Sequence, residues 1–426
     1  MSDAMLEPIP LPANVLGSWR EALRLVRARS TELGNALSQV EQAQAQAETA
    51  LSRAYPIVSA TSSLQQHLLL GKGTNFTADG PQNNVDIPNP STLWSAKLSV
   101  RQPLVNLQTW QDVRAARATQ HAAQIRTLDV ERQVLARVAD TIVLVVTAER
   151  LAEVSRVALR ASLSSLDLTR RRAQLGASSA LDVLRAEQEV ALNRTQVVAS
   201  NESLLKARES LGMALGYSGA WGVRPEIRLD DLGKDARSVC SPVNSLAERA
   251  DLQAAQADLD AAKTTSEAAR YRLAPTLDLV SDVTVQTGPV TPNGRPMQWT
   301  VGALLSVPIY DGGSRNAERH LNSARIDSAK QTLTQASRNA ELQVVQATRA
   351  VDVATQNFEL SRTTRDLAKE TSRLAKLSFI NGKATSFELV DATRREQQAE
   401  LDLAVKEFDV VRARISALLA QSNCDL

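Results

Sequence analysis

Two stretches of the chain alternate between apolar and polar residues. "WSAKLSVRQPL" begins at Trp94 and "WTVGALLSVPI" begins at Trp299, 205 positions later (299 − 94). A period of two is typical of β-strands with one apolar and one polar face. The apolar face takes Trp94, Ala96, Leu98 and Val100 in the first stretch, and Trp299, Val301, Ala303, Leu305 and Val307 in the second. Residues 277–286 alternate in the same way and predict a further strand.

Most of the remaining chain has the pattern of very long helices. Neither proline nor glycine interrupts residues 111–175 or 314–380. At the α-helical rise each segment would span on the order of 95 Å, far more than a globular domain needs. Apolar residues recur at steps of three and four, in Val130, Val134, Val138, Ile142 and Val145, and in Val344, Ala347, Val351, Ala354 and Phe358. This spacing is typical of a coiled coil, and a wall of helices around a tube would share it.

The second half of the chain repeats the first. "RSTEL" (29–33) aligns with "ERADL" (248–252), and Pro56 aligns with Pro275. "LGASSALDVLRA" (175–186) aligns with "INGKATSFELVDA" (380–392) at an offset of 206. Self-similarity over such a length indicates a duplicated structural unit. We therefore predict a first repeat over 1–215, a linker over 216–243 and a second repeat over 244–426.

Each repeat is expected to hold two strands and one tight turn. The strands fall at about 56–70 and 92–104 in the first repeat, and at about 275–287 and 297–309 in the second. The turns fall at about 175–179 and 381–385. Residues 70–91 and 287–296 are rich in Gly, Pro and Asn, so we expect loops there.

The strands have two interpretations. A sandwich that packs one face of each strand would show the same alternation, but four strands are few for a sandwich. Transmembrane barrel strands also alternate over about ten residues, with aromatic residues at the membrane edge. Trp94 and Trp299 stand at equivalent strand ends, where such an aromatic girdle would place them. Four strands cannot close a barrel, since about eight are needed, so membrane strands would require an oligomer.

Composition limits the classes of function. Charged residues make up 23% of the chain and leave a net charge of +2, which gives no broad basic surface for nucleic acid. No segment has the roughly 18 apolar residues of a membrane-spanning helix. The first twenty residues lack the pattern of a signal peptide, so the protein is either intracellular or its signal is absent from this numbering.

The chemistry-bearing residues indicate no enzyme. Motifs for zinc hydrolysis, phosphate binding or nucleophilic catalysis do not occur, and His67, His121 and His320 are isolated. We expect no cofactor and no metal. Cys240 and Cys424 fit no metal spacing: they are either two free thiols or one disulfide between the linker and the C-terminus, which would require an oxidising compartment.

With its duplicated order, the chain resembles the TolC-type outer membrane factors, also called outer membrane efflux proteins. The resemblance covers nearly the whole chain and rests on residues 18–56 and 249–277, on "SVPIYDGGSR" (306–315) and on the two Gly turns. It implies a mainly α-helical fold with a small β part. Three chains would form a twelve-stranded outer-membrane β-barrel, four strands from each, continued by a periplasmic α-helical barrel. Residues 1–18, 216–243 and the C-terminus would form an equatorial band.

The resemblance also assigns roles to the turns. Leu175, Gly176, Ala177, Asn381, Gly382 and Lys383 would form the periplasmic tip where adaptor proteins dock. Asp182, Glu388 and Asp391 match acidic residues that line the channel constriction. "SALD" (179–182) and "TSFE" (385–388) are also capping boxes, so Asp182 and Glu388 have a purely structural alternative, and Asp391 is the better candidate. Phe379 and Ala384 stand where the family can carry Tyr and Arg, and Lys383 could substitute in part for that polar lock.

We therefore expect a passive exit duct in the outer membrane of a Gram-negative bacterium, extending into the periplasm. Its implied partners are two further copies of the chain, a periplasmic adaptor (membrane fusion) protein, an inner-membrane transporter and outer-membrane lipid, with no nucleic acid. It would serve either efflux or type I secretion. The alternative is a soluble coiled-coil scaffold or adaptor, in which the strands form a small domain between helical hairpins.

Overall fold

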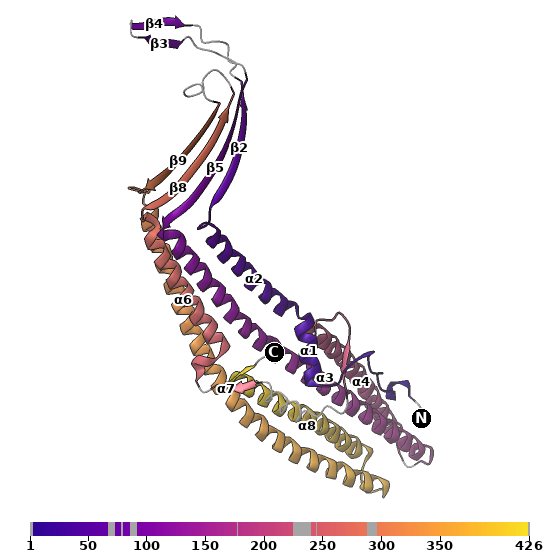
Figure 1. The fold of residues 1–426 in the computed structure, drawn as a ribbon. Helices are drawn as coiled ribbons and strands as arrows, with labels where there is room; N and C mark the ends of the chain where they lie inside the picture. The colour runs from indigo at the N-terminus through magenta and orange to yellow at the C-terminus, as the bar shows by residue number, and fades with distance from the viewer. Residues whose placement is uncertain are drawn as a thin grey trace. The chain divides into compact units, whose positions relative to one another are not determined.

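The computed structural model describes residues 3–66, 73–77, 80–85, 92–176, 178–224, 240–243, 245–287 and 296–424. Helices dominate the described chain (Figure 1). Their bounds are α1 Trp19–Arg29, α2 Thr31–Ser52, α3 Leu107–Gln174, α4 Ala180–Ala214, α6 Ala250–Arg270, α7 Ser314–Ile380 and α8 Ser386–Ala420, with short 3-10 turns at Ala4–Leu6, Leu246–Glu248 and Tyr271–Leu273. Among these described helices none is apolar over a length that could cross a membrane.

The two long helices expected from the sequence are confirmed. α3 has 68 residues and α7 has 67. In α3 the predicted apolar row is buried from Val134 to Val145. In α7 the predicted row holds the less exposed positions, and Ala354 is buried. Each row therefore marks the face that the helix packs against its own chain.

Contacts within the chain define two compact units. Unit 1 comprises residues 1–39, 124–256 and 332–426, and unit 2 comprises residues 40–123 and 257–331. Each unit takes segments from both sequence repeats, so the repeats are not the compact bodies. The reason is that segments of the two repeats pair with each other, as residues 95–106 do with residues 276–286. The boundaries proposed for the repeats and the linker stay predictions.

Unit 2 contains a four-stranded antiparallel sheet with the order β2-β5-β8-β9 (Figure 1). The strands are β2 Ile57–Gln65, β5 Leu93–Asn106, β8 Thr276–Gln286 and β9 Met297–Ser306. Their register skips one residue of β5 between Pro103 and Val105. Proline has no N–H to donate to a ladder, which accounts for an irregularity at this point.

The register aligns the alternating faces of all four strands. Leu98 lies opposite both Ala60 and Val283, and Val283 lies opposite Trp299. Apolar residues of every strand therefore share one face. The other face carries charged side chains, paired as Lys97–Asp282 (3.2 Å) and Arg101–Asp278 (2.6 Å).

Part of the expected first loop is a β-hairpin. Strands β3 Gly73–Thr77 and β4 Gly80–Val85 pair antiparallel inside the stretch 70–91. Their sequences, "GTNFT" and "GPQNNV", have no apolar alternation. The expectation of a plain loop was therefore wrong for these residues, because hydrophobic period does not reveal a polar hairpin.

Unit 1 holds the main hydrophobic core. Residues of α1, α3, α4 and α8 pack there around Trp19, Ile142, Leu211 and Phe408. Two short ladders join distant segments: β1 Asn14–Leu16 pairs with β6 Trp221–Val223, and β7 Cys240–Pro242 pairs with β10 Ser422–Cys424. The N-terminal segment, the predicted linker and the C-terminus are thus connected through backbone hydrogen bonds.

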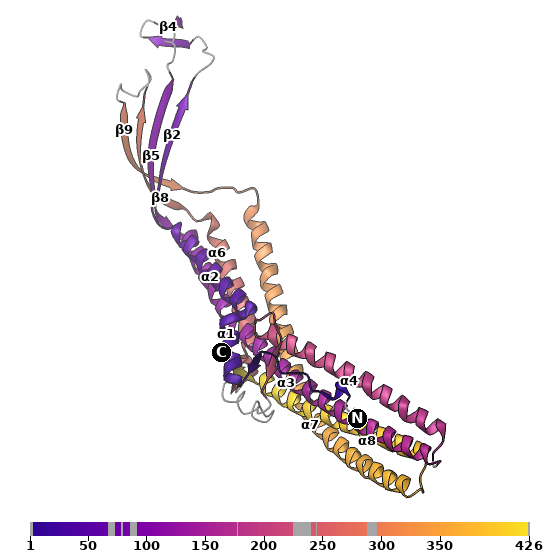
Figure 2. The ribbon, with the colours of Figure 1, turned by 90° about the vertical axis from the view of Figure 1, so that its right-hand side faces the viewer.

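Two helical hairpins complete unit 1, formed by α3 with α4 and by α7 with α8 (Figure 2). Polar contacts join α7 to α8, α8 to α3 and α3 to α4. These contacts are Arg365–Glu400 (3.4 Å), Gln397 Nε2–Ala158 O (3.3 Å) and Arg170–Glu187 (2.6 Å). α4 also packs directly on α8, so the four helices form a bundle and not a single row.

Candidate functional site

The turn between α3 and α4 is built by a glycine and a capping box. Gly176 has a φ of 72°, a backbone conformation that favours glycine. Asp182 N–H donates to Ser179 Oγ (3.2 Å), and Ser179 N–H donates to Asp182 Oδ2 (3.0 Å). The backbone and side-chain hydrogen bonds from Ser179 lower the pKa of Asp182, so this carboxylate stays ionised as the cap of α4.

The turn between α7 and α8 repeats this design 206 residues later. Gly382 has a φ of 73°. Glu388 N–H donates to Thr385 Oγ1 (3.3 Å), and Thr385 N–H donates to Glu388 Oε2 (2.7 Å). The capping boxes expected at both turns are therefore confirmed. A further role of Asp182 and Glu388 in a constriction stays a prediction.

The two hairpins contact each other beside these turns. The Arg172 guanidinium lies 4.1 Å from the centroid of the Phe379 ring and also donates to the Phe379 carbonyl. Arg185 stacks more loosely over Phe387, at 5.6 Å. These arginine–aromatic contacts join α3 to α7 and α4 to α8. Phe379 is 2% exposed, so its ring is buried in this contact.

The predicted docking residues lie at the surface of the turns. Leu175 is 82% exposed, and Asn381, Gly382 and Lys383 are exposed as well. Ala177 lies outside the described residues. Exposed Leu181, Ile380 and Phe387 flank the turns. The tip therefore exposes apolar side chains, and adaptor docking there stays a prediction.

Asp391, the favoured constriction residue, is paired within its own helix. Its carboxylate contacts Arg394 (3.3 Å) and Arg395 (2.9 Å). The neighbouring positive charges offset the charge that Asp391 would present to a passing ion. Its role as a constriction residue stays a prediction.

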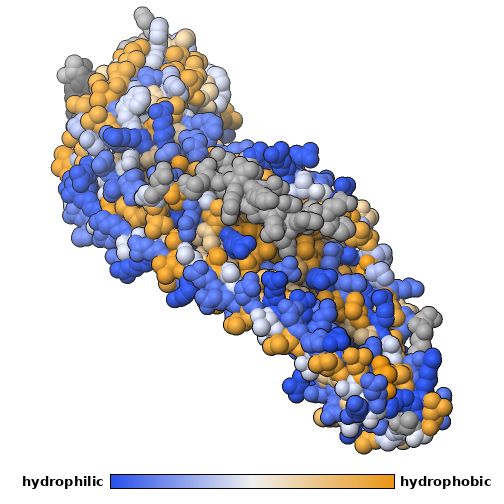
Figure 3. Space-filling model, turned by 90° about the horizontal axis from the view of Figure 1, so that it is seen from below, coloured by the Kyte–Doolittle hydropathy of each residue, from blue (hydrophilic) through white to orange (hydrophobic). Residues whose placement is uncertain are grey.

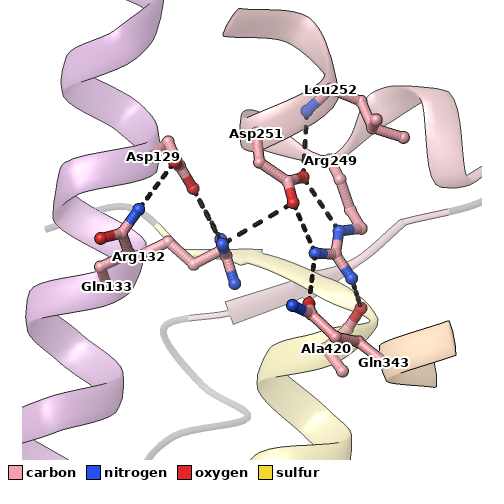
Figure 4. A network of polar contacts seen from close by, with 8 residues as sticks. All are labelled: Asp129, Arg132, Gln133, Arg249, Asp251, Leu252, Gln343 and Ala420. Carbon is pink, nitrogen blue, oxygen red and sulfur yellow. Dashed lines mark hydrogen bonds and ion pairs between the residues drawn. The ribbon is translucent and has the colours of Figure 1, made fainter. Parts of the chain in front are cut away.

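A polar cluster ties the start of α6 to three other helices (Figure 4). Arg249 is fully buried and donates to the Ala420 carbonyl at the end of α8 (2.9 Å) and to Gln343 of α7 (2.9 Å). Asp251 accepts two bonds from Arg249 (2.6 and 3.0 Å) and lies 3.9 Å from Arg132 of α3.

The charges in this cluster compensate one another. Burial raises the pKa of Asp251, but the hydrogen bonds and charge of Arg249, with the charge of Arg132, outweigh it and leave that pKa below its usual range. Asp129 neutralises Arg132 in turn, at 2.9 Å. The cluster therefore stabilises the ionised form of Asp251.

The two tryptophans occupy equivalent positions in the sheet. Trp94 Nε1 donates to Ser62 of β2 (3.0 Å), and Trp299 Nε1 donates to Ser281 of β8 (2.9 Å). Each serine lies opposite the residue two positions after its tryptophan. Both rings are exposed on the apolar face, 40% for Trp94 and 70% for Trp299. A membrane girdle at these positions remains a prediction.

A metal centre has no candidate in the described part of the chain, where no three His, Cys, Asp or Glu residues gather. Grooves between helices do occur there. One, of about 360 Å³, runs between α3, α7 and α8 and is lined by Arg150, Glu153, Lys369 and Glu400 among others. Such grooves result from helix packing and carry no catalytic arrangement.

Comparison with known proteins identifies the family to which the chain belongs. The family model described as "Outer membrane efflux protein" matches residues 22–217 and 242–419. These ranges cover most of the chain and form two halves. The chain belongs to the outer membrane efflux protein family. As a member of this family it is a TolC-type efflux channel of the outer membrane, not an enzyme, and it extends into the periplasm.

Individual outer membrane efflux proteins agree with this assignment. The pyoverdine export outer membrane protein OpmQ of Pseudomonas aeruginosa is 24% identical over 382 residues, covering 88% of this chain and 79% of OpmQ. The crystal structure of CusC superposes with a TM-score of 0.78 at 18% identity, covering 99% and 98% of the two chains. The open state of the Neisseria gonorrhoeae MtrE outer membrane channel gives 0.74 at 18%, covering 94% and 88%. These structures establish the TolC-like fold.

The family assignment sets aside the alternative of a soluble coiled-coil scaffold. The contacts of Arg172 and Arg249 were predicted neither by the sequence pattern nor by the family resemblance. Arg172 and Arg249 stood among many arginines, and their partners Phe379 and Ala420 lie 207 and 171 positions away. No local pattern links residues at such separations.

Proposed function

We propose that the chain works as a homotrimeric, passive exit duct whose twelve-stranded barrel receives four strands from each copy. The sheet of one chain supports this, because its order β2-β5-β8-β9 leaves β2 and β9 as edge strands. Exposed edges favour pairing with another chain. Closing a barrel needs about eight strands or more, and three copies supply enough.

The two faces of the sheet support an assignment of lipid side and channel side. Trp94, Trp299, Val301 and Leu305 are exposed on the apolar face, which suits lipid. The ion pairs Lys97–Asp282 and Arg101–Asp278 lie on the other face, which suits a water-filled channel. Trp299 aligns with Leu98, four residues after Trp94. A stagger of this kind accompanies the tilt of barrel strands, so both rings could reach one membrane boundary.

Exposed apolar rows on α4 and α7 support contacts between the helices of neighbouring copies. α7 exposes Val353, Leu360, Leu367 and Leu374 at intervals of seven residues, and α4 exposes Leu184, Val198 and Leu205 with Ala191 between them. On the face drawn in Figure 3, hydrophobic residues are interspersed among hydrophilic ones. Heptad rows among polar residues are typical of coiled-coil seams. We assign α4 of one copy and α7 of the next to one seam.

Opening of the duct would begin at the tip. The Arg172–Phe379 and Arg185–Phe387 contacts hold the two hairpins of a chain together. A periplasmic adaptor with its inner-membrane transporter would bind the exposed turn residues and favour an arrangement with these contacts broken. Asp182, Glu388 and Asp391 would line the constriction in the closed arrangement. That the related MtrE channel has an open state agrees with such a change.

The cargo is proposed from the names of the relatives alone. OpmQ exports pyoverdine, and FusA of Burkholderia cepacia, 30% identical over 162 residues, is a fusaric acid resistance protein. We infer that small organic molecules, rather than polypeptides, pass through the duct.

The trimer is tested at the α7 row. Replacing Leu360 and Leu367 by Gln should convert detergent-extracted trimer to monomer, because two apolar knobs leave the seam. The matched control replaces Arg362 and Lys369 by Gln, two positions further along the same helix and on its opposite side. Size-exclusion chromatography with light scattering measures the mass. Trimer in the leucine variant, or monomer in both variants, would contradict the assigned seam.

A further inference from the structure

We propose that Cys240 and Cys424 form an intramolecular disulfide that covalently closes the β7–β10 ladder. The two strands are antiparallel, and their register places Cys424 directly opposite Cys240. The same register places Ser422 opposite Pro242. Residues 184 positions apart (424 − 240) are therefore brought together by the backbone alone.

The hydrogen-bond pattern defines what kind of pair the cysteines make. Val243 N–H donates to the Gln421 carbonyl (2.9 Å), so these two opposed residues form a hydrogen-bonded pair. In an antiparallel ladder hydrogen-bonded and non-hydrogen-bonded pairs alternate. Pro242–Ser422 is then non-hydrogen-bonded, in agreement with the missing N–H of proline. Two steps further, Cys240–Cys424 is non-hydrogen-bonded as well.

Such a pair meets the geometric requirement of a disulfide. Opposed residues of a non-hydrogen-bonded pair have Cα atoms about 4.5 Å apart. Disulfides need a Cα separation of about 4.4–6.8 Å.

A buried anchor next to the ladder keeps this register in place. Arg249 follows Pro242 by seven residues, is fully buried and donates to the Ala420 carbonyl at 2.9 Å. Ala420 precedes β10 by two residues, and Ser422 is itself buried. Both strands are thus held at one end, and the cysteines lie at the other.

The periplasm contains the oxidants that disulfide formation requires. The chain extends into the periplasm, which is kept oxidising by proteins that donate disulfides. The thiolate of one cysteine attacks the disulfide of such an oxidant, and the second thiolate then displaces the oxidant from the mixed disulfide. One S–S bond forms in the chain while one breaks in the oxidant, whose two sulfurs leave as thiols carrying both electrons and both protons. The product ring encloses α6, β8, β9, α7 and α8.

The test uses the full chain exported behind a signal peptide and purified from outer membrane without reductant. Thiols are alkylated in denaturant, and the protein is cut after arginine and lysine. We expect peptide 238–249 to be found joined to peptide 415–426, with neither cysteine alkylated. After reduction both cysteines should take the alkyl group. The Cys424→Ser variant should leave Cys240 alkylated without any reductant.

Amide hydrogen exchange distinguishes a disulfide bond from two thiols that are merely close together. Reductant should speed amide hydrogen exchange in residues 240–243 and 421–424 of the natural chain. It should have no effect on a chain that carries both Cys240→Ser and Cys424→Ser. Alkylation of both cysteines before reduction, or linkage between two separate chains, would overturn the proposal. Either result would leave mass and conductance, and so the proposed duct, untouched.

Discussion

At the scale of single residues, close backbone approach fixes the junction between α4 and its following turn. Gly212 lies inside α4, and a Cβ atom built on it would stand 1.8 Å from the Gly219 carbonyl oxygen. Gly34, inside α2, has no atom within 4 Å of such a Cβ. The two helical glycines therefore have opposite consequences for substitution.

We expect Gly212→Ala to destabilise the protein by about 3 kcal/mol, because the methyl group forces the backbone apart. Gly34→Ala should stabilise it by about 0.5–1 kcal/mol through the higher helix propensity of alanine. Thermal unfolding followed by circular dichroism measures both. Equal effects of the two substitutions would show that the turn does not pack against α4.

The buried Arg249–Asp251 pair leads to a second prediction about stability. Replacing Asp251 by Ala leaves the buried Arg249 charge without its carboxylate, at a cost of about 3 kcal/mol. The control Asp260→Ala lies on the same helix in an exposed pair with Lys263 and should change stability by at most about 1 kcal/mol.

The pH dependence of this pair has a definite sign. The pKa of Asp251 is lowered in the folded chain. The contribution of the Asp251 carboxylate to the free energy of unfolding is therefore complete above its unfolded pKa. It is lost as the pH falls through the folded pKa. Below about pH 4 the difference between wild type and Asp251→Ala should shrink in denaturant titrations. A difference that grows in acid would contradict the ion pair.

At the scale of elements, the sheet depends on the register that aligns its two faces. Val283 lies on the apolar face, opposite Leu98 and Trp299, while the adjacent Thr284 lies on the face of Lys97. A slip of one residue would exchange these faces. Neighbouring positions of one strand therefore test the proposed lipid and channel faces.

Val283→Arg should lower the yield of assembled protein, since Val283 lies opposite Trp299 near the proposed membrane boundary, where a charge on the lipid side costs up to about 1 kcal/mol. Thr284→Arg, one residue further, should be tolerated. The yield of heat-sensitive trimer in outer-membrane extracts measures both. Equal yields, or a loss only for Thr284→Arg, would assign the faces the other way or remove the sheet from lipid.

Sequence alone predicted the elements whose signal repeats along the chain. The four sheet strands alternate over nine residues or more, the long helices lack Gly and Pro, and each capping box lies within four consecutive residues. The hairpin β3–β4 and the three-residue ladders β1–β6 and β7–β10 have too short or too polar a pattern. Contacts such as Arg172–Phe379 depend on how two hairpins pack, which no local period encodes.

At the scale of the whole molecule, the proposed opening depends on the contacts that join the two hairpins of each chain. Arg172 contributes both its ring contact with Phe379 and a hydrogen bond to the backbone. Arg171, its neighbour, pairs only along its own helix with Asp167 in the contacts described, and its side chain is 73% exposed. Substitutions at these two positions therefore distinguish loss of the link between hairpins from a general loss of positive charge.

Arg172→Ala should favour the open arrangement by about 1 kcal/mol, which is roughly a fivefold change in the ratio of open to closed channels. Arg171→Ala should leave that ratio unchanged. Single-channel recording in planar bilayers measures the open fraction. An identical rise in both variants would assign the effect to tip charge rather than to the Arg172–Phe379 contact.

The most direct test of the duct is to reconstitute the chain itself. The full chain, exported behind a signal peptide, would be extracted from outer membrane in detergent, and its mass and planar-bilayer conductance measured. We predict a heat-sensitive trimer that forms ion channels. A monomer or dimer that needs no detergent and conducts no current would contradict the trimeric barrel.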